Sequence, residues 1–265
     1  MIISLKDKSV RPQNISPRTF LLSTKQKFDL IMLPVVDAFG GSSGMYALQE
    51  QYLLTTESFN EMMNALTRDG AVSITTYIDY PYRNPLKILA TFAEVFEKRK
   101  IENPEEYIAA IKNWNTITFL MKKDPLTVSE IDSIRSFCYI MNFDPVLLPG
   151  IAEHEREKFN RLQDTSIYSM FDKILLSKEE REKLYAEYPF NIKPATDNQP
   201  YFSQFLQWKT IPLLADLFGN QSVPFFEVGY LLMYLTFFQI TVLAVIVLII
   251  VPILSLDLRE IIRRH

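Results

Sequence analysis

An uninterrupted apolar segment constrains the fold more than any other feature of this sequence. Residues Val228–Leu256 contain no ionisable group except tyrosine over 29 positions. A helix of this length rises about 43 Å, enough to cross a hydrocarbon core of about 30 Å with tilt or with a kink near Pro252. The alternative, a helix buried in protein on every side, would need a domain larger than the rest of this chain can form. The sequence therefore predicts a transmembrane helix over residues 227–256, followed by a basic tail at 257–265.

The bulk composition excludes several functional classes. A net charge of -3, with both signs interspersed, gives no basic surface of the kind that nucleic-acid binders use. The single cysteine, Cys138, sits in a helical pattern where a small apolar residue fits the core, so the chain holds no disulfide framework or thiolate metal site. Its two histidines, His154 and His265, are too few for a histidine-based metal site, and we expect no Ser-His-Asp triad.

Short apolar runs alternate with helical patterns before this helix, which indicates an α/β fold. The run "FDLIMLPVV" at 28–36 is typical of an inner parallel strand covered on both faces. The following helical pattern has Thr55 or Thr56 as its cap and Gly70 at its end, and a second strand begins at Ala71. Together these segments predict one βαβ unit.

The pattern continues with further elements. A helix is predicted with Pro85 in its first turn, then two strands joined by a tight turn at Asn113–Asn115. Thr127 and Glu130 form a capping box for the helix that contains Cys138, and "FDPVLLP" reads as a last strand.

These patterns divide the chain into regions. Residues 1–150 are predicted to form part of a doubly wound, Rossmann-like domain, and residues 151–226 a helical extension and a linker rich in proline and aromatic residues. A doubly wound nucleotide-binding domain normally opens with a strand, a glycine-rich turn and a helix. Residues 1–27 contain no glycine, so the chain is expected to start at the second half of such a domain, as a fragment of a longer protein.

The order of several motifs resembles the spermidine synthase family, and more closely its membrane-embedded branch in the S-adenosylmethionine-binding Rossmann superfamily. The similarity covers about Ser16 to His265. It is carried by "KFDLIMLPVVDAFGGSSGMYALQEQYLLTTESFNEMMNALTRDGAVSIT", "NWNTITFLMKKDPLT", "PATDNQPYFSQFLQW" and "EVGYLLMYLTFFQ". The resemblance implies the C-terminal half of a doubly wound methyltransferase or spermidine synthase-type domain.

The resemblance also places an acceptor site after the first strand. In the soluble synthases this strand ends in an acid, two small residues and a second acid. Here Pro34 occupies the first of these positions and Asp37 the second. The first acid is credited with activating the attacking amine, and proline cannot accept a proton. Ser16 stands where an acid would hold the cofactor adenine. Asp37 is left as a weak catalytic candidate and as a candidate to orient a cationic acceptor.

Four other residues are weaker candidates for substrate binding. Ser42 and Ser43 belong to the loop "GGSSG", which is not followed by a lysine and favours a gate loop or plain turn over a phosphate loop. Asp197 and Tyr201 could line the acceptor pocket. The alternative, which we favour, is that their segment docks the linker against the domain and the membrane interface.

Two functions remain open. The first is a transferase-type domain that, in a complete protein, would bind S-adenosylmethionine or its decarboxylated form and move a methyl or aminopropyl group to a small amine or a membrane-proximal acceptor. For this chain alone we expect no cofactor binding and no catalysis. The second is a non-catalytic, membrane-anchored Rossmann-like module with a structural or partner-binding role. Partners would be membrane lipid, further membrane segments or a second copy, with no nucleic acid.

The sequence gives opposing indications of the side of the membrane on which the α/β domain lies. Arg259, Arg263 and Arg264 follow the apolar helix, whereas Lys209 is the nearest basic residue before it, which would place the domain outside the cytosol. Large domains follow this rule poorly, the N-terminus has no secretory pattern, and S-adenosylmethionine is cytosolic. We therefore expect a cytosolic domain.

Overall fold

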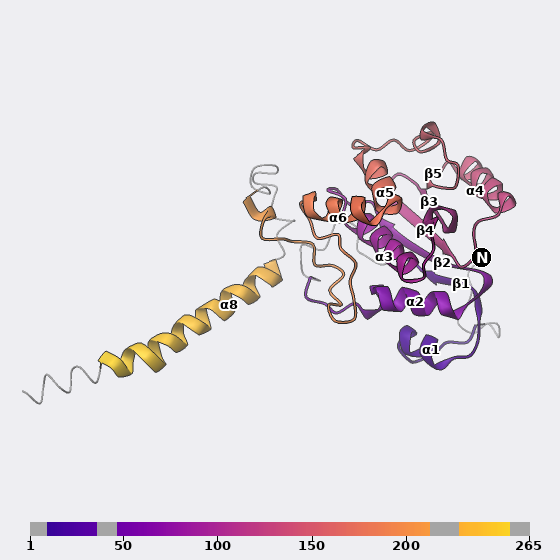
Figure 1. Ribbon diagram of the computed structural model, residues 1–265. Helices are drawn as coiled ribbons and strands as arrows, with labels where there is room; N and C mark the ends of the chain where they lie inside the picture. The colour runs from indigo at the N-terminus through magenta and orange to yellow at the C-terminus, as the bar shows by residue number, and fades with distance from the viewer. Residues whose placement is uncertain (1–9, 36–46, 213–227, 255–265) are drawn as a thin grey trace, which may run out of the picture.

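The computed structural model describes residues 10–35, 47–212 and 228–254. It contains a mixed α/β domain and a long apolar helix that projects from it (Figure 1). The strands are β1 Phe28–Leu33, β2 Leu66–Tyr77, β3 Ile108–Lys112, β4 Thr116–Lys122 and β5 Asp144–Leu147. The helices are α1 Pro17–Ser23, α2 Thr56–Ala65, α3 Asn84–Lys98, α4 Val128–Met141, α5 Ser166–Leu176, α6 Lys178–Glu187 and α8 Val228–Val245, with short helical turns η1 Tyr52–Leu54, η2 Pro104–Tyr107, η3 Glu153–Glu155 and η5 Ile246–Ile250.

The five strands form one mixed sheet in the order β1-β2-β4-β3-β5. β1 and β2 are parallel, and the other three neighbouring pairs are antiparallel. From these pairings β3 runs in the same direction as β1 and β2. The carboxyl ends of β1, β2 and β3 therefore lie at one edge of the sheet, which we call the carboxyl edge.

The main hydrophobic core fills one face of the sheet. Alternate residues of β4, such as Phe119 and Met121, point into this core, where α2, α3 and α5 pack. On the opposite face a small cluster around Ala109 and Leu148 lies under α4. The same face of β1 is left open, because Leu30 and Met32 are 48% and 62% exposed.

The βαβ unit is confirmed, with two corrections. α2 is capped by Thr55, one of the two predicted cap residues, but it ends at Ala65 rather than at Gly70, and β2 begins at Leu66. The start of β2 bulges, so that the pairing with β1 shifts between Phe28 and Leu30. Gly70 serves this bulge: a Cβ atom there would lie 2.8 Å from the Phe28 carbonyl oxygen. Glycine is used for close backbone approach and not as a helix end.

The position of β1 is the second correction. β1 is the edge strand among the described strands, not an inner strand covered on both faces. The apolar run also stops pairing at Leu33, so that Pro34 and Val35 are exposed. An apolar run indicates a strand but does not report whether a neighbour pairs with both of its edges.

Other predicted elements are present. Pro85 lies in the first turn of α3, and the turn at Asn113–Asn115 joins β3 to β4 in a hairpin. Thr127 and Glu130 form the capping box of α4, and the Cys138 side chain on that helix is buried. Burial raises the pKa of the Cys138 thiol to about 11.

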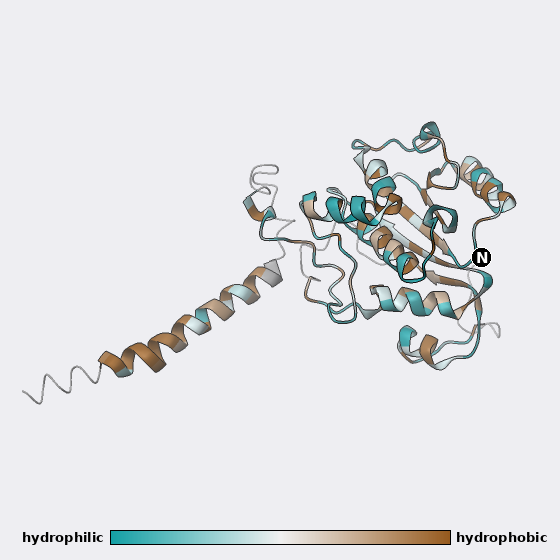
Figure 2. Cartoon of the chain, in the orientation of Figure 1, coloured by the Kyte–Doolittle hydropathy of each residue, from teal (hydrophilic) through white to brown (hydrophobic). Residues whose placement is uncertain are grey.

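One helix is long and apolar enough to cross a membrane. It covers Leu231–Leu254, and none of its most apolar stretch is buried in the protein. Figure 2 shows the helix, coloured hydrophobic over its far part, projecting away from the domain. It follows the domain and is exposed, so it is unlike the buried core helix of a soluble protein. The turn Ile246–Ile250 is a π-helix that ends two residues before Pro252, in the turn where a proline removes a backbone hydrogen bond.

Candidate functional site

The candidate site is the carboxyl edge of the sheet, where open α/β sheets bind their ligands. Three of the predicted site residues, Asp37, Ser42 and Ser43, lie outside the described residues. The structure does describe Pro34, which follows β1 and is exposed, and the segments that surround the predicted loop. These segments are η1, the start of α2 and residues 188–206.

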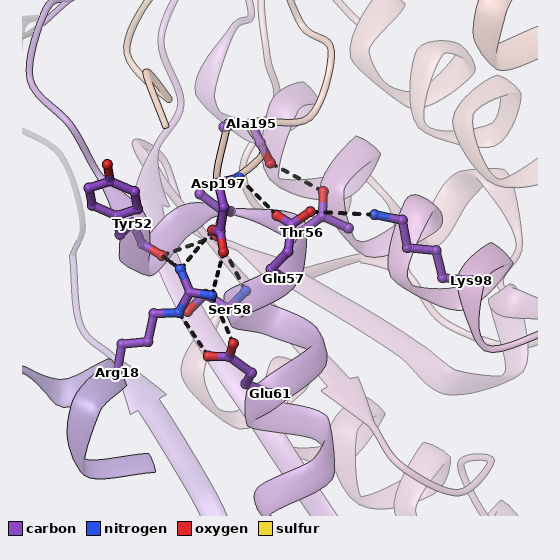
Figure 3. Close-up of polar contacts among 10 residues, drawn as sticks. Arg18, Tyr52, Thr56, Glu57, Ser58, Glu61, Lys98, Ala195 and Asp197 are labelled. Atoms are coloured by element: carbon purple, nitrogen blue, oxygen red, sulfur yellow. Dashed lines mark hydrogen bonds and ion pairs between the residues drawn. The ribbon is translucent and has the colours of Figure 1, made fainter. Parts of the chain in front are cut away.

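Asp197 lies at this edge beside the start of α2, where it binds Arg18 (Figure 3). Two guanidinium nitrogens of Arg18 donate to the two carboxylate oxygens of Asp197, each at 2.7 Å. Two nitrogens of the same guanidinium donate to Glu61 on α2, each at 2.8 Å. The Arg18 guanidinium thus links α1 to α2 and to the segment near residue 197. The sequence patterns did not identify Arg18 as part of the site.

The cap of α2 takes part in the same cluster. The Thr55 hydroxyl accepts the Ser58 N–H at 3.2 Å and lies 2.8 Å from an oxygen of Asp197, to which it donates. The Asp197 N–H in turn donates to Glu57 at 3.0 Å. Hydrogen bonds to Arg18 hold the pKa of Asp197 below its usual value. Hydrogen bonds to Glu61 and Asp197 raise the pKa of Arg18.

Backbone contacts hold the middle of the segment 188–206 against the start of α2 and the residues before η1. The Thr56 N–H donates to the Ala195 carbonyl at 2.9 Å, and the Gln51 N–H to the Pro200 carbonyl at 2.7 Å. Tyr201, the last predicted site residue, follows Pro200 and is half-buried. Asp197 and Tyr201 thus lie in one segment beside the predicted acceptor loop, with Asp197 engaged by Arg18.

A second polar group, also missed from the sequence, lies where β2 ends. Asp79 accepts the backbone N–H and the Nε–H of Arg83, both at 3.0 Å. Burial raises the pKa of Asp79 despite this partner. The Arg83 guanidinium lies 5.5 Å from the ring centres of both Phe190 and Phe205. Asp79 could have been found from the sequence, because it is an acid shortly after a strand. The same pattern identified Asp37.

Lys87 in the first turn of α3 completes this group. Its side chain is buried, its ammonium donates to the Gln204 carbonyl at 3.1 Å, and it lies 4.8 Å from the Phe205 ring centre. Residues 188–206 therefore cover the start of α2, and they present aromatic rings and a carbonyl group to the side chains that follow β2. The cations beneath them, Arg83 and Lys87, bind this segment.

A pocket of about 700 Å³ lies elsewhere, between α4 and the segment that follows β5. Its walls include Arg135, Tyr139, Phe143, His154 and Lys158. His154 is exposed there, as the charged sequence around it suggested. Within the described part of the chain, no group of three or more His, Cys, Asp or Glu side chains is arranged to hold a metal ion.

Comparison with protein-family models and with curated proteins gives no match for this chain. The likeness to the spermidine synthase family therefore rests on the sequence motifs alone.

Proposed function

We propose that this chain is a membrane-anchored, Rossmann-like domain of the spermidine synthase-like type that does not catalyse group transfer on its own. In a complete protein such a domain would supply the acceptor side of a site for S-adenosylmethionine or decarboxylated S-adenosylmethionine. The transferred group would be methyl or aminopropyl, and the acceptor a small amine or a membrane-proximal group.

The parallel unit β1-α2-β2 supports the Rossmann-like part of this proposal. Such units place ligands at the carboxyl ends of their strands, and here loops from several segments converge at that edge. The apolar helix Leu231–Leu254 supports the membrane anchor. A cytosolic position of the domain is part of the proposal, because the cofactor is cytosolic.

One observation carries the proposal that the chain lacks independent catalysis: Arg18 engages both carboxylate oxygens of Asp197. A carboxylate that binds a cationic substrate would have to give up this bidentate pair, which is among the stronger hydrogen-bonded arrangements in proteins. Asp79 is held in a similar way by Arg83. With Pro34 at the position of the expected base, Asp37 remains the candidate to orient an amine.

Calorimetric titration of the purified chain in detergent with each cofactor tests this proposal. We expect no heat of binding from S-adenosylmethionine or from its decarboxylated form. Micromolar binding of either one would overturn the claim that the chain lacks a cofactor site. If the complete protein transfers an aminopropyl or methyl group, Asp37→Asn should slow it, whereas Asp29→Asn on the exposed part of β1 should not.

The position of β1 at the edge of the described sheet, with one face exposed, favours the second candidate function, a module that binds a partner. Parallel strands are normally covered on both faces, yet Leu30 and Met32 of β1 are exposed. Edge strands with exposed apolar side chains pair readily with another strand. Mass measurement of the detergent-solubilised chain tests this candidate: a monomer at all concentrations would argue against self-pairing through β1.

A further inference from the structure

The domain contacts the start of its own membrane helix. The Trp208 ring lies 5.4 Å from the Tyr234 ring, centre to centre, with the two planes at 85°. Leu231 on α8 and Ile211 before it both pack against the main hydrophobic core. The first turns of the membrane helix are therefore held by the domain itself.

Side-chain bonds hold the Trp208 segment against the end of α6. The Lys209 ammonium donates to the Ala186 carbonyl at 2.6 Å, and the Thr210 hydroxyl donates to the Pro189 carbonyl. Thr210 is fully buried. Trp208 therefore occupies a defined position next to the point where the helix leaves the domain.

The length of the remaining helix fits the bilayer. After Tyr234, the residues from Leu235 to Leu254 would rise about 30 Å, which matches the hydrocarbon thickness. This places Tyr234 and Trp208 at the level of the lipid headgroups, where tyrosine and tryptophan are favoured. Counted to Leu254, where the described part of the helix ends, this length leaves no further turns between Tyr234 and a hydrocarbon core of this thickness.

Exposed aromatic side chains also lie on the segments that follow the strands ending at the carboxyl edge. Tyr52 follows β1, Tyr80 follows β2, and Trp114 lies in the turn that follows β3. The Ile78 N–H donates to the Asn115 carbonyl at 2.7 Å, which ties that turn to the end of β2. We call Tyr52, Tyr80, Trp114 and Trp208 the aromatic rim; they are 43%, 61%, 72% and 58% exposed.

We propose that the domain rests directly on the bilayer, with the carboxyl edge and its aromatic rim facing the lipid headgroups. Figure 1 shows α8 leaving on the side of the segment that covers this edge, away from the start of β1. The partner is the headgroup layer of the membrane that α8 enters. This inference rests on the membrane anchor of the proposed function and adds that an acceptor would reach the site from the membrane surface.

The two tryptophans of the chain allow a direct test. Trp114→Phe leaves Trp208 as the reporter, and Trp208→Phe leaves Trp114 while keeping an aromatic ring against Tyr234. A control reporter, Arg68→Trp with both native tryptophans changed to phenylalanine, lies in the bulge at the opposite edge, where the Arg68 side chain is 88% exposed. Each full-length variant is reconstituted in phosphatidylcholine vesicles that carry nitroxide labels on the headgroups.

We expect the strongest fluorescence quenching for Trp208, less for Trp114 and least for the Arg68→Trp reporter. Quenching of Trp208 no stronger than that of the control would overturn the inference, and so would weaker quenching of Trp114 than of the control. Flotation of the vesicles after alkaline washing separates the two proposals. A chain that floats but shows no quenching of Trp208 refutes only the inference, whereas a chain that fails to float refutes the membrane anchor as well.

Discussion

Arg18 and Asp197 are 179 residues apart in the sequence and form two hydrogen bonds of 2.7 Å between a guanidinium and a carboxylate. The pair joins α1, before the first strand, to the segment that covers the carboxyl edge. Because Arg18 also binds Glu61, one side chain connects three parts of the domain.

Loss of Arg18 should destabilise the domain. Arg18→Ala removes charge-assisted bonds to two carboxylates that are partly exposed, so we expect a loss of about 1–2 kcal/mol in the free energy of unfolding. Arg18→Lys should recover part of the lost stability, because lysine keeps the positive charge but lacks the planar guanidinium that binds a carboxylate through two nitrogens. Denaturant unfolding in detergent, with Arg68→Ala as an exposed control, measures both. Equal losses of stability in Arg18→Ala and Arg68→Ala would refute this role of Arg18.

The Arg18–Asp197 pair should make stability depend on acid pH. The folded pKa of Asp197 is lowered, so its contribution is present above the unfolded value of about 4 and is lost as pH falls through the folded pKa. The stability difference between the native chain and Asp197→Asn should therefore be constant from pH 7 to about 5 and shrink below about 4. A difference that grows on acidification would contradict this sign.

The buried pair Lys112 and Asp144 should be sensitive to removal of one partner. Both side chains are almost fully buried, and Asp144 also accepts the N–H groups of Phe159 and Asn160. Lys112→Met would leave the carboxylate without its counter-charge, and we expect a loss of about 3–5 kcal/mol.

The double variant Lys112→Met with Asp144→Leu separates charge from packing. It removes both charges and should cost less than Lys112→Met alone, although the N–H groups of Phe159 and Asn160 lose their acceptor. Unfolding curves of the single and double variants measure the two losses of stability. A double variant less stable than the single one would show that the bonds from Phe159 and Asn160 to Asp144 contribute more than the charge of Lys112.

Gly70 should not accept a side chain. A methyl group there would lie 2.8 Å from the Phe28 carbonyl oxygen, so Gly70→Ala must displace β1, and we expect a loss of about 1–3 kcal/mol. Gly150→Ala is the matched control: its φ of +69° is strained for alanine, but no atom lies within 4 Å of the added carbon. Amide exchange in β1 should rise in Gly70→Ala and stay unchanged in Gly150→Ala.

Cys138 should be unreactive in the folded protein. The thiol is buried and its pKa is raised to about 11, so little thiolate exists at neutral pH. Because it is the only cysteine, mass spectrometry after iodoacetamide treatment counts its modification directly. We expect no adduct at pH 7.5 in the folded chain and complete modification in denaturant. Rapid labelling of the folded chain would show that α4 opens.

Local patterns in the sequence predicted local structure well. The cap at Thr55, the capping box of Thr127 and Glu130, and the turn at Asn113–Asn115 are each specified by residues a few positions apart. The burial of Cys138 followed from its place in a helical pattern.

Features that depend on distant contacts were not predictable from these patterns. Nothing near Arg18 indicates that its partner is Asp197, and nothing in β1 shows that it is the edge strand among the strands the structure describes. Gly70 was misread because a glycine after a helical pattern commonly ends the helix, whereas here the nearby Phe28 carbonyl decides its role. Asp79 was overlooked although it follows a strand just as Asp37 follows the apolar run.

The packing of Leu231 and Tyr234 against the domain has a mechanical consequence. If α8 spans the bilayer as proposed, a thinner bilayer would be accommodated by a greater tilt of the helix. Because the first turns of α8 are held by the domain, a change in tilt must either rotate the whole sheet or break the contact between Trp208 and Tyr234. Bilayer thickness would then set the angle at which the carboxyl edge meets the lipid.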